Sequence, residues 1–399
     1  MIYKCIYTYT AHLCRKKQSV RKARVQNRMS ETTIAVQDTV ILIPSLEPDE
    51  RLPAYIRQLS ENGFKNIVIV DDGSSEAYQP IFREAEDAAN AVVLHHEVNR
   101  GKGVALKTGY RYIIDHMPQV AGIITADADG QHTVPDCIRL AEKLAEGKRA
   151  VYLGSRDFNL PDIPPKSRTG NKITSTVFKI LYGVWLPDTQ TGLRAFRRED
   201  LQFMADVDGE RYEYEMKVLI ACATKKIPLI PVTIETIYEN GNEGTHFHPI
   251  RDSYRIYKVI LGSFFRFMGS SIICFAADQL LFNLFLKWLF PLLGIRLGIA
   301  LPFGMELNNT SLANYTARLF SAVLNFRLNK DLVFRVKGGK RTALHYAVTA
   351  IGIIILSTLG IKALGLIGMT EWLAKLIVDT LLYFLSYRIQ QQWVFKEGA

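Results

Sequence analysis

The chain has 399 residues, of which 48% are hydrophobic, and a formal net charge of +10. This length exceeds one ordinary domain, so we expect two or three. The excess of positive charge lies near the start of the sequence, and it therefore does not indicate nucleic-acid binding. The five cysteines include no CxxC pair, which excludes a disulfide framework or a cysteine zinc site and fits a reducing compartment.

Residues 1–36 are predicted to form a basic, disordered extension. The segment lacks the apolar core of a signal peptide, and Met29 could serve as an alternative start. Contact with anionic lipid is the other interpretation of its charge. The cations that precede its first acid, Glu31, are Lys4, Arg15, Lys16, Lys17, Arg21, Lys22, Arg24 and Arg28.

Residues 37–250 alternate between short apolar runs and helical patterns. This alternation predicts an α/β domain with a mostly parallel sheet and helices on both faces. The predicted strands are 39–44, 66–71, 91–95, 122–126, 150–154, 191–196 and 227–237. The predicted helices are 50–62, 78–89, 101–116, 134–146, 171–183 and 212–225, with a proline-rich loop over 158–167.

The fourth predicted strand ends at two carboxylates, Asp127 and Asp129, with Gln131 close behind. Ligands bind at the carboxyl ends of the strands in an open parallel sheet. Two acids and an amide at alternating positions suit a hard divalent cation. A solvated turn is equally compatible with this stretch, because Asp and Gly are ordinary turn residues.

Two other polar segments follow predicted strands. Asp71 and Asp72 can accept hydrogen bonds from a nucleobase or a ribose, or they form a turn that caps the next helix. Residues 99–106 place Lys102 and a second cation among glycines at a helix start, which makes a good anion site. The segment is not a P-loop, because no Ser or Thr follows Lys102, and it lacks the third glycine of a dinucleotide fingerprint.

Later in the domain, Arg156 and Arg168 could bind phosphate, or they are ordinary surface arginines. Asp188 and Arg194 delimit a compact polar cluster between apolar segments. Acids at positions 213 and 215 open the next helix, where first-turn acids are also simply favourable to the helix dipole.

The chain becomes far more apolar after residue 250. A basic amphipathic segment over 251–262 is expected at a membrane surface. Residues 263–397 are predicted to form a membrane domain with four transmembrane helices, since a crossing needs roughly 20 residues. These helices are expected near 264–290, 309–328, 344–366 and 372–389. The connection between the second and third is rich in Lys and Arg, which predicts that it, both termini and the α/β domain are cytoplasmic.

Two acids lie inside the predicted spans, Asp278 and Asp379. Such residues are costly in a membrane and usually functional, although a structural hydrogen bond between helices is the alternative. Residues 324–335 resemble residues 385–396, and each segment ends a span. This similarity indicates a duplicated two-helix hairpin, a common plan among transporters, unless it arose by chance.

The ordered motifs together resemble the inverting family 2 glycosyltransferases of the GT-A fold, and in particular the polyprenyl-phosphate sugar transferases of the dolichyl-phosphate mannose synthase and GtrB type. The likeness covers residues 37–260, while residues 261–397 resemble the four-helix GtrA family. The segments that carry the first likeness are Pro44, 70–74, 100–103, 127–131 and 188–194. One departure is that Ser45-Leu46-Glu47 follows Pro44 in place of the family's x-Tyr-Asn-Glu.

This resemblance implies that Asp127, Asp129 and Gln131 hold Mg²⁺ or Mn²⁺ on the pyrophosphate of a nucleotide-diphosphate sugar. It implies that Asp71 and Asp72 face the base and ribose, and that Arg156 and Arg168 bind the acceptor phosphate. Pro44, Lys102 and Arg194 complete the expected donor site. Asp129 and Asp188 are expected catalytic residues, with Asp188 orienting groups, because a phosphate acceptor needs no strong base.

The implied protein is a multi-pass enzyme of the cell membrane that transfers a sugar to polyprenyl (undecaprenyl) phosphate on the cytoplasmic face. Its expected partners are the nucleotide sugar, the polyprenyl phosphate and membrane lipid. Assembly into a homo-oligomer is also compatible with the sequence. The membrane domain would help to translocate the product for cell-surface polysaccharide synthesis. One alternative is a flippase with a regulatory soluble domain. Another is a processive polysaccharide synthase, whose Gln-x-x-Arg-Trp motif has a partial match only at Gln390–Trp393.

Overall fold

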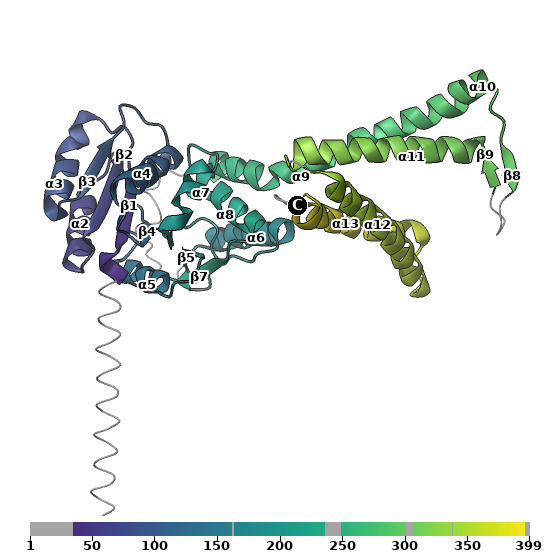
Figure 1. Cartoon of the computed structure of the whole chain (residues 1–399). Coiled ribbons are helices and arrows are strands. Elements are labelled where there is room, and N and C mark those ends of the chain that lie inside the picture. The colour runs from purple at the N-terminus through teal and green to yellow at the C-terminus, as the bar shows by residue number, and fades with distance from the viewer. Residues whose placement is uncertain (1–34, 162, 236–248, 301–305, 337, 396–399) are drawn as a thin grey trace, which may run out of the picture. The chain divides into compact units, whose positions relative to one another are not determined.

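The computed structural model describes residues 35–161, 163–235, 249–300, 306–336 and 338–395 (Figure 1). The predicted basic extension thus lies, apart from its last two residues, outside the described part of the chain. Contacts divide the chain into two units. Unit 1 runs to Ile256 except for Ile180–Tyr182, and unit 2 comprises those three residues and the chain from Tyr257 onward.

Unit 1 contains a seven-stranded sheet in the order β3-β2-β1-β4-β6-β5-β7. Neighbouring strands are parallel except β6, which runs antiparallel to both β4 and β5. This sheet confirms the predicted mostly parallel α/β fold. The strands are β1 (Thr39–Ser45), β2 (Asn66–Asp71), β3 (Val92–His95), β4 (Gly122–Thr125), β5 (Val151–Ser155), β6 (Arg194–Arg197) and β7 (Leu229–Thr233).

Helices cover both faces of this sheet, which explains why β1 and β2 are apolar at successive positions. Ile41 and Ile43 share a buried cluster with residues of α2, α3 and α5. Leu42 points to the other face, where it lies beside Gly109 of α4. The helices of unit 1 are α2 (Arg51–Glu61), α3 (Gln79–Ala89), α4 (Lys102–His116), α5 (Val134–Ala145), α6 (Pro165–Tyr182), α7 (Leu201–Asp206) and α8 (Glu213–Lys225).

Two features of unit 1 differ from the sequence prediction. Helix α6 begins at Pro165, within the stretch predicted as a loop. Proline is well suited to the first turn of a helix, because its missing N–H would have no partner there. The short helix α7 also has no counterpart among the predicted elements.

Unit 2 consists mainly of long helices, and one helix lies at the position of each of the four predicted spans. They are α9 (Pro249–Leu284), whose first residues still belong to unit 1, α11 (Asn309–Leu328), α12 (Lys340–Leu366) and α13 (Glu371–Ile389). The short α10 (Phe290–Leu292) and a hairpin of β8 (Gly298–Ala300) and β9 (Glu306–Asn308) lie between α9 and α11. The hairpin was not predicted.

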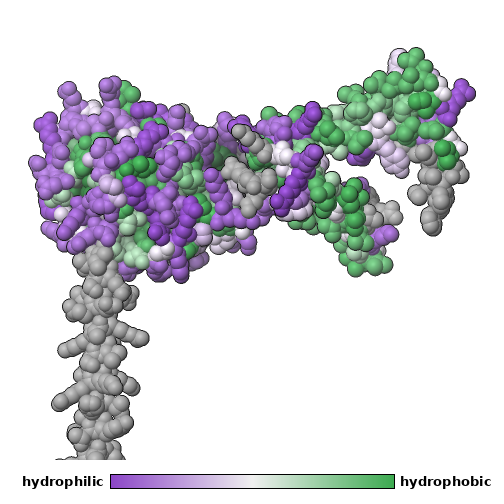
Figure 2. Space-filling view, in the orientation of Figure 1, coloured by the Kyte–Doolittle hydropathy of each residue, from purple (hydrophilic) through white to green (hydrophobic). Residues whose placement is uncertain are grey.

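The surface of the helical unit is strongly apolar (Figure 2). Among the residues that the structure describes, two helical stretches are long and apolar enough to cross a membrane, Tyr254–Leu292 and Lys340–Leu366. Helices α11 and α13 each continue into a π-helical turn, Asn329–Val333 and Gln390–Val394 respectively. These two turns lie in the repeated sequence segments, so the similarity between the segments extends to an unusual backbone conformation.

Candidate active site

The polar motifs of unit 1 gather at one edge of the sheet. Asp71 ends β2, Asp127 lies two residues beyond β4, and Arg156 directly follows β5. Strand β6 is antiparallel, so it begins at this same edge, and its first residue, Arg194, pairs with Thr125 at the end of β4. The carboxyl ends of parallel strands are the usual ligand-binding edge of such sheets.

Asp127 and Lys102 form the central ion pair of this edge. The Lys102 Nζ atom lies 2.6 Å from Asp127 Oδ1 and 3.1 Å from Glu215 Oε1. Lys102 starts helix α4 and Glu215 lies in the first turn of helix α8. One ammonium therefore joins three segments that are far apart in the sequence.

Burial and neighbouring charge shift the pKa values of Asp127 and Lys102 in opposite directions. Burial alone would raise the pKa of the Asp127 carboxyl, but the charge of Lys102 outweighs it and the pKa falls to about 2. Burial likewise works against the charged form of Lys102, yet the charges of Asp127 and Glu215 raise its pKa above the usual range. Both groups are thus ionised at neutral pH.

The position next to the Asp127 carboxylate is occupied by Gly192, and a side chain there would collide with the carboxylate. A Cβ atom at position 192 would lie 2.3 Å from Asp127 Oδ2. The Thr125 hydroxyl donates to the Gly192 carbonyl at 2.8 Å, which fixes the backbone at this distance. The segment before β6 and the end of β4 are therefore held together around the carboxylate.

The turn that follows Asp127 is ordered by its own side chains. The Asp129 Oδ1 atom accepts a hydrogen bond from the backbone N–H of Gln131 at 3.1 Å. The backbone N–H of Asp127 donates to His132 Nδ1 at 3.0 Å. Burial lowers the pKa of His132 although Asp127 opposes this shift, so the imidazole is neutral and its Nδ1 atom can accept.

The residues present fit a divalent cation. Asp127 already holds a cationic group, the ammonium of Lys102, at hydrogen-bond distance. Within the described ranges no group of three or more His, Cys, Asp or Glu side chains could hold a metal by itself. Mg²⁺ is commonly bound by one or two carboxylates together with substrate phosphates, so the pair Asp127 and Asp129 is compatible with such a site, and the assignment of Asp127, Asp129 and Gln131 as metal ligands stays a prediction.

Asp71 and Asp72 are both buried and already have protein partners. Asp71 accepts from the Ser74 backbone at 2.8 Å and lies 3.0 Å from His95 Nδ1. Burial would raise its pKa, but these hydrogen bonds lower it. The expected contacts of these two acids with a base or ribose therefore stay predictions, and their observed role is to order loops.

Asp72 orders the loop that carries Lys102. Its carboxylate accepts from the backbone N–H groups of Arg100 at 3.0 Å and Gly101 at 2.7 Å, and it also bonds His96 at 2.8 Å. Gly101 has φ +98°, and a Cβ atom there would meet the Glu210 carbonyl at 2.5 Å. Asp72 thus positions the start of helix α4 and, through it, Lys102.

Arg156 and Asp188 form a second ion pair. The Arg156 Nε atom lies 2.7 Å from Asp188 Oδ2, and its Nη2 atom lies 3.3 Å from Oδ1. The charge of Arg156 also contributes to the low pKa of Asp127. The Asp188 side chain is fully buried, whereas 29% of the Arg156 side chain is exposed.

Arg168 and Arg194 make backbone contacts instead. The Arg168 guanidinium donates to the carbonyls of Phe158 and Leu160, each at 2.9 Å. The buried Arg194 donates to the carbonyls of Thr191 at 3.0 Å and Glu215 at 2.8 Å. Arg194 therefore ties the Gly192 segment to helix α8, and Arg168 orders the loop before helix α6.

The remaining predicted residues lie apart from these ion pairs. Pro44 is buried in strand β1, where it pairs with Val70. In unit 2, the buried Asp278 accepts from the Ser321 hydroxyl at 3.0 Å and lies 3.8 Å from the Arg318 Nε atom. Asp379 is more exposed and contacts Ser357 at 2.6 Å and Lys375 at 2.7 Å.

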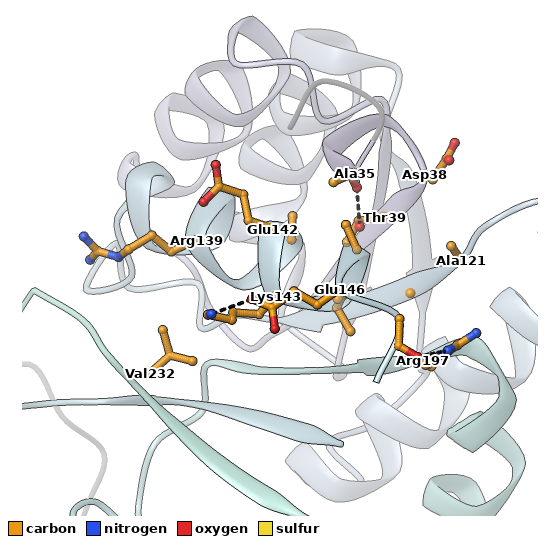
Figure 3. Close-up of a pocket in the computed structure, with 15 residues that line it drawn as sticks. Ala35, Asp38, Thr39, Ala121, Arg139, Glu142, Lys143, Glu146, Arg197 and Val232 are labelled. Atoms are coloured by element: carbon orange, nitrogen blue, oxygen red, sulfur yellow. Dashed lines mark hydrogen bonds and ion pairs between the residues drawn. The ribbon is translucent and has the colours of Figure 1, made fainter. Parts of the chain in front are cut away.

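A large cavity of about 890 Å³ lies elsewhere in unit 1 (Figure 3). Its lining includes Thr39 and Gly122, the first residues of β1 and β4, together with Lys143 and Glu146. These strand starts are at the opposite edge of the sheet from Asp127. The cavity is therefore not the candidate active site.

Three partners in the site were not predicted as site residues. In the sequence Glu215 fits an acid that is favourable to the helix dipole, and neither His96 nor His132 lies within one of the predicted site motifs. The sequence offers one signal for the two histidines, which is their place in the chain: His96 directly follows β3, and His132 directly follows Gln131. The long-range contacts themselves arise only from the fold.

Comparisons with known proteins agree with this architecture. The family Glycosyl transferase family 2 matches residues 40–203, and the family GtrA/DPMS, transmembrane domain, matches residues 303–395. Uncharacterized protein MJ1222 of Methanocaldococcus jannaschii is 30% identical over 229 residues, which are 56% of this chain and 92% of that protein.

Two further relatives have names that state an activity. The UDP-N-acetylglucosamine–dolichyl-phosphate N-acetylglucosaminyltransferase of Methanococcus voltae is 28% identical over 215 residues, covering 50% of this chain and 85% of the relative. The polyprenol monophosphomannose synthase of Mycolicibacterium smegmatis is 25% identical over 211 residues, which cover 51% of this chain and 78% of the relative. The chain belongs to the family 2 glycosyltransferases and carries a GtrA/DPMS-type transmembrane domain.

Proposed function

We propose that this protein transfers a sugar from a nucleotide-diphosphate sugar to a polyprenyl phosphate, with inversion at the anomeric carbon. The observation that carries the proposal is the presence of two ion pairs at one sheet edge, Asp127–Lys102 and Arg156–Asp188. The first suits a pyrophosphate with its metal, and the second suits a phosphate acceptor. The names of two relatives, which act on dolichyl phosphate and make a polyprenol-linked mannose, agree with this acceptor class.

On the donor side, Asp127, Asp129 and Gln131 would hold Mg²⁺ or Mn²⁺. A divalent cation there would stabilise the negative charge that develops on the pyrophosphate leaving group. Lys102 lies beside Asp127 and adds a positive charge for the same phosphates. Arg194 keeps Gly192 and helix α8 in place around this group.

On the acceptor side, Arg156 would bind the polyprenyl phosphate through its partly exposed guanidinium, with Arg168 as a second candidate. One phosphate oxygen attacks the anomeric carbon as the bond from that carbon to the nucleotide diphosphate breaks. The attacking oxygen is anionic near neutral pH, so no side chain has to remove a proton. Asp188 then serves to orient Arg156, to which it is bonded at 2.7 Å.

The membrane unit supports a reaction on a lipid at the cytoplasmic membrane face. We expect specifically that the acceptor is undecaprenyl phosphate and that the membrane unit translocates the product. The product would then serve cell-surface polysaccharide synthesis. Asp278 supports translocation, because it is a buried acid paired with Ser321 and Arg318 inside an apolar unit. Replacing Asp278 with Asn should lower the delivery of product across the membrane while sugar transfer stays normal.

The proposal is tested by incubating membranes that contain the full chain with labelled nucleotide sugars and either undecaprenyl or dolichyl phosphate. A labelled lipid should form, and EDTA should abolish it until Mg²⁺ or Mn²⁺ is restored. Asp129→Ala should be inactive, whereas the exposed Asp115→Ala should retain activity. Full transfer by Asp129→Ala or in EDTA would refute the metal assignment, and an absence of product with every donor would refute the proposed reaction.

A further inference from the structure

We propose that Lys102 is an internal counter-cation, which pairs with Asp127 and is displaced from it when a divalent cation binds. The inference rests on the proposed metal role of Asp127 and concerns how that role is regulated. Its starting point is the 2.6 Å distance between the Lys102 Nζ atom and Asp127 Oδ1. A carboxylate oxygen held this closely by an ammonium cannot at the same time be a close metal ligand without strong repulsion between the two cations.

Both oxygens of Asp127 have close neighbours. A Cβ atom at Gly192 would lie 2.3 Å from Oδ2 and 2.7 Å from Oδ1. His132 Nε2 lies 3.9 Å from Oδ2. A divalent cation bound to this carboxylate would therefore share it with the Lys102 ammonium on Oδ1, and the two cations would repel each other.

Lys102 has a second anchor that would remain after this exchange. Its ammonium is 3.1 Å from Glu215 Oε1, and the Glu215 side chain is only 14% exposed. The backbone at the start of helix α4 is fixed by the bonds from Arg100 and Gly101 to Asp72. The exchange thus requires only a side-chain movement, in which the ammonium leaves Asp127, stays near Glu215 and becomes available to the pyrophosphate.

The alternative is a purely structural ion pair that never opens. A structural pair and an exchanging pair make different predictions for metal binding. Removal of a structural pair would disorder Asp127 and weaken metal binding. Removal of a competing cation would instead strengthen metal binding in the absence of nucleotide.

The experiment measures Mn²⁺ affinity of the detergent-solubilised full chain by paramagnetic resonance of free Mn²⁺, with no nucleotide and then with UDP or GDP. We expect Lys102→Met to bind Mn²⁺ about tenfold more tightly than wild type without nucleotide, because a charged hydrogen bond no longer competes. With UDP or GDP this advantage should shrink or reverse, because the ammonium that helps to hold the phosphates is gone.

Two further variants separate the specific effect from other causes. Lys102→Arg keeps the competing charge and should bind Mn²⁺ as weakly as wild type. Lys107→Met makes the same charge change in helix α4, where Lys107 packs on the Tyr214 ring at 5.1 Å, and should leave Mn²⁺ affinity unchanged. Thermal unfolding of each variant verifies that it is folded.

The outcomes distinguish this inference from the proposed function. An unchanged or weaker affinity of folded Lys102→Met, with normal Mn²⁺ binding by wild type in the presence of nucleotide, would overturn the exchange and leave the metal site intact. A failure of wild type to bind Mn²⁺ under all conditions would overturn the metal assignment and the exchange together.

Discussion

Asn329 and Gln390, which are 61 residues apart, form a hydrogen bond from Asn329 Nδ2 to Gln390 Oε1 at 2.9 Å. They occupy equivalent positions in the repeated segments 324–335 and 385–396. Another equivalent pair, Phe334 and Phe395, stacks with ring centroids 5.0 Å apart. Contact between a residue and its own counterpart is the mark of a two-fold arrangement, so the two hairpins pack locally like the halves of a symmetric dimer.

Loss of the Asn329 amide should weaken this packing. Asn329→Leu removes the amide that donates to Gln390 Oε1, whereas the Ser270 hydroxyl, which donates to Asn329 Oδ1 at 2.6 Å, keeps the Phe267 carbonyl as a partner at 2.8 Å. We expect a loss of about 1 kcal/mol in the free energy of unfolding, in the range measured for hydrogen bonds between membrane helices. Unfolding in mixed micelles measures this free energy. The control is Asn283→Leu, because within the described part of the chain the Asn283 amide donates to the Gln279 carbonyl of its own helix α9. Asn329→Leu combined with Gln390→Leu should cost less than the sum of the two, and strict additivity would contradict the coupling.

Substitution of Gly192 should impair catalysis without unfolding the protein. A Cβ atom in Gly192→Ala would push against Asp127 Oδ2 from 2.3 Å and move the carboxylate. We expect kcat to fall at least about tenfold, since a small misplacement at a reacting centre is costly. Gly170→Ala is the matched control, because a Cβ atom there meets nothing within 4 Å. Equal activity of both variants would contradict the importance of this contact.

Conversion of Arg156 to Lys should affect the lipid acceptor selectively. Lysine cannot reproduce the two-pronged contact with Asp188 or offer a planar fork to a phosphate. We expect KM for polyprenyl phosphate to rise about tenfold or more, with little change in KM for the nucleotide sugar. Arg168→Lys should have a smaller effect, because Arg168 donates to two backbone carbonyls. An equal rise for both substrates would argue against an acceptor role for Arg156.

Removal of the Asp72 carboxylate should destabilise unit 1 and weaken donor binding together. In Asp72→Ala the N–H groups of Arg100 and Gly101 lose their acceptor. Unsatisfied buried donors cost about 1–3 kcal/mol each, so chemical denaturation should show a clear loss. KM for the nucleotide sugar should rise as Lys102 loses its position. If stability falls and this KM does not change, Asp72 only supports the fold.

Much of unit 1 could be predicted, because its signals are local. Apolar runs such as 39–44 and 66–71 end where their strands end, and parallel strands bring their carboxyl ends to one edge, so Asp71 and Asp127 were expected there. Four helices of unit 2 were predicted for the same reason, from apolar length. The start of helix α6 differs from the prediction, because the proline-rich stretch 158–167 is typical of a loop.

The partners of the site residues could not be predicted in this way. Glu215 reaches Lys102 only because helix α8 packs near the start of helix α4, and His96 reaches Asp72 across neighbouring strands. No spacing in the sequence encodes these contacts. Asp72 is an example. Its sequence context predicts contact with a ligand, whereas in the structure its carboxylate accepts hydrogen bonds from two backbone N–H groups.

The antiparallel strand β6 has a consequence for the order of events on the ribosome. Thr125 and Gly192 bond across 67 residues, so the surroundings of Asp127 are complete only when the segment that leads into β6 has been synthesised. All seven strands of the sheet precede helix α9, because β7 ends at Thr233 and α9 begins at Pro249. Since N-terminal domains fold first during synthesis, the catalytic sheet can close before the long apolar helices emerge. Stalled nascent chains that end after β5 should be protease-sensitive, and resistance should appear only once β7 has left the exit tunnel.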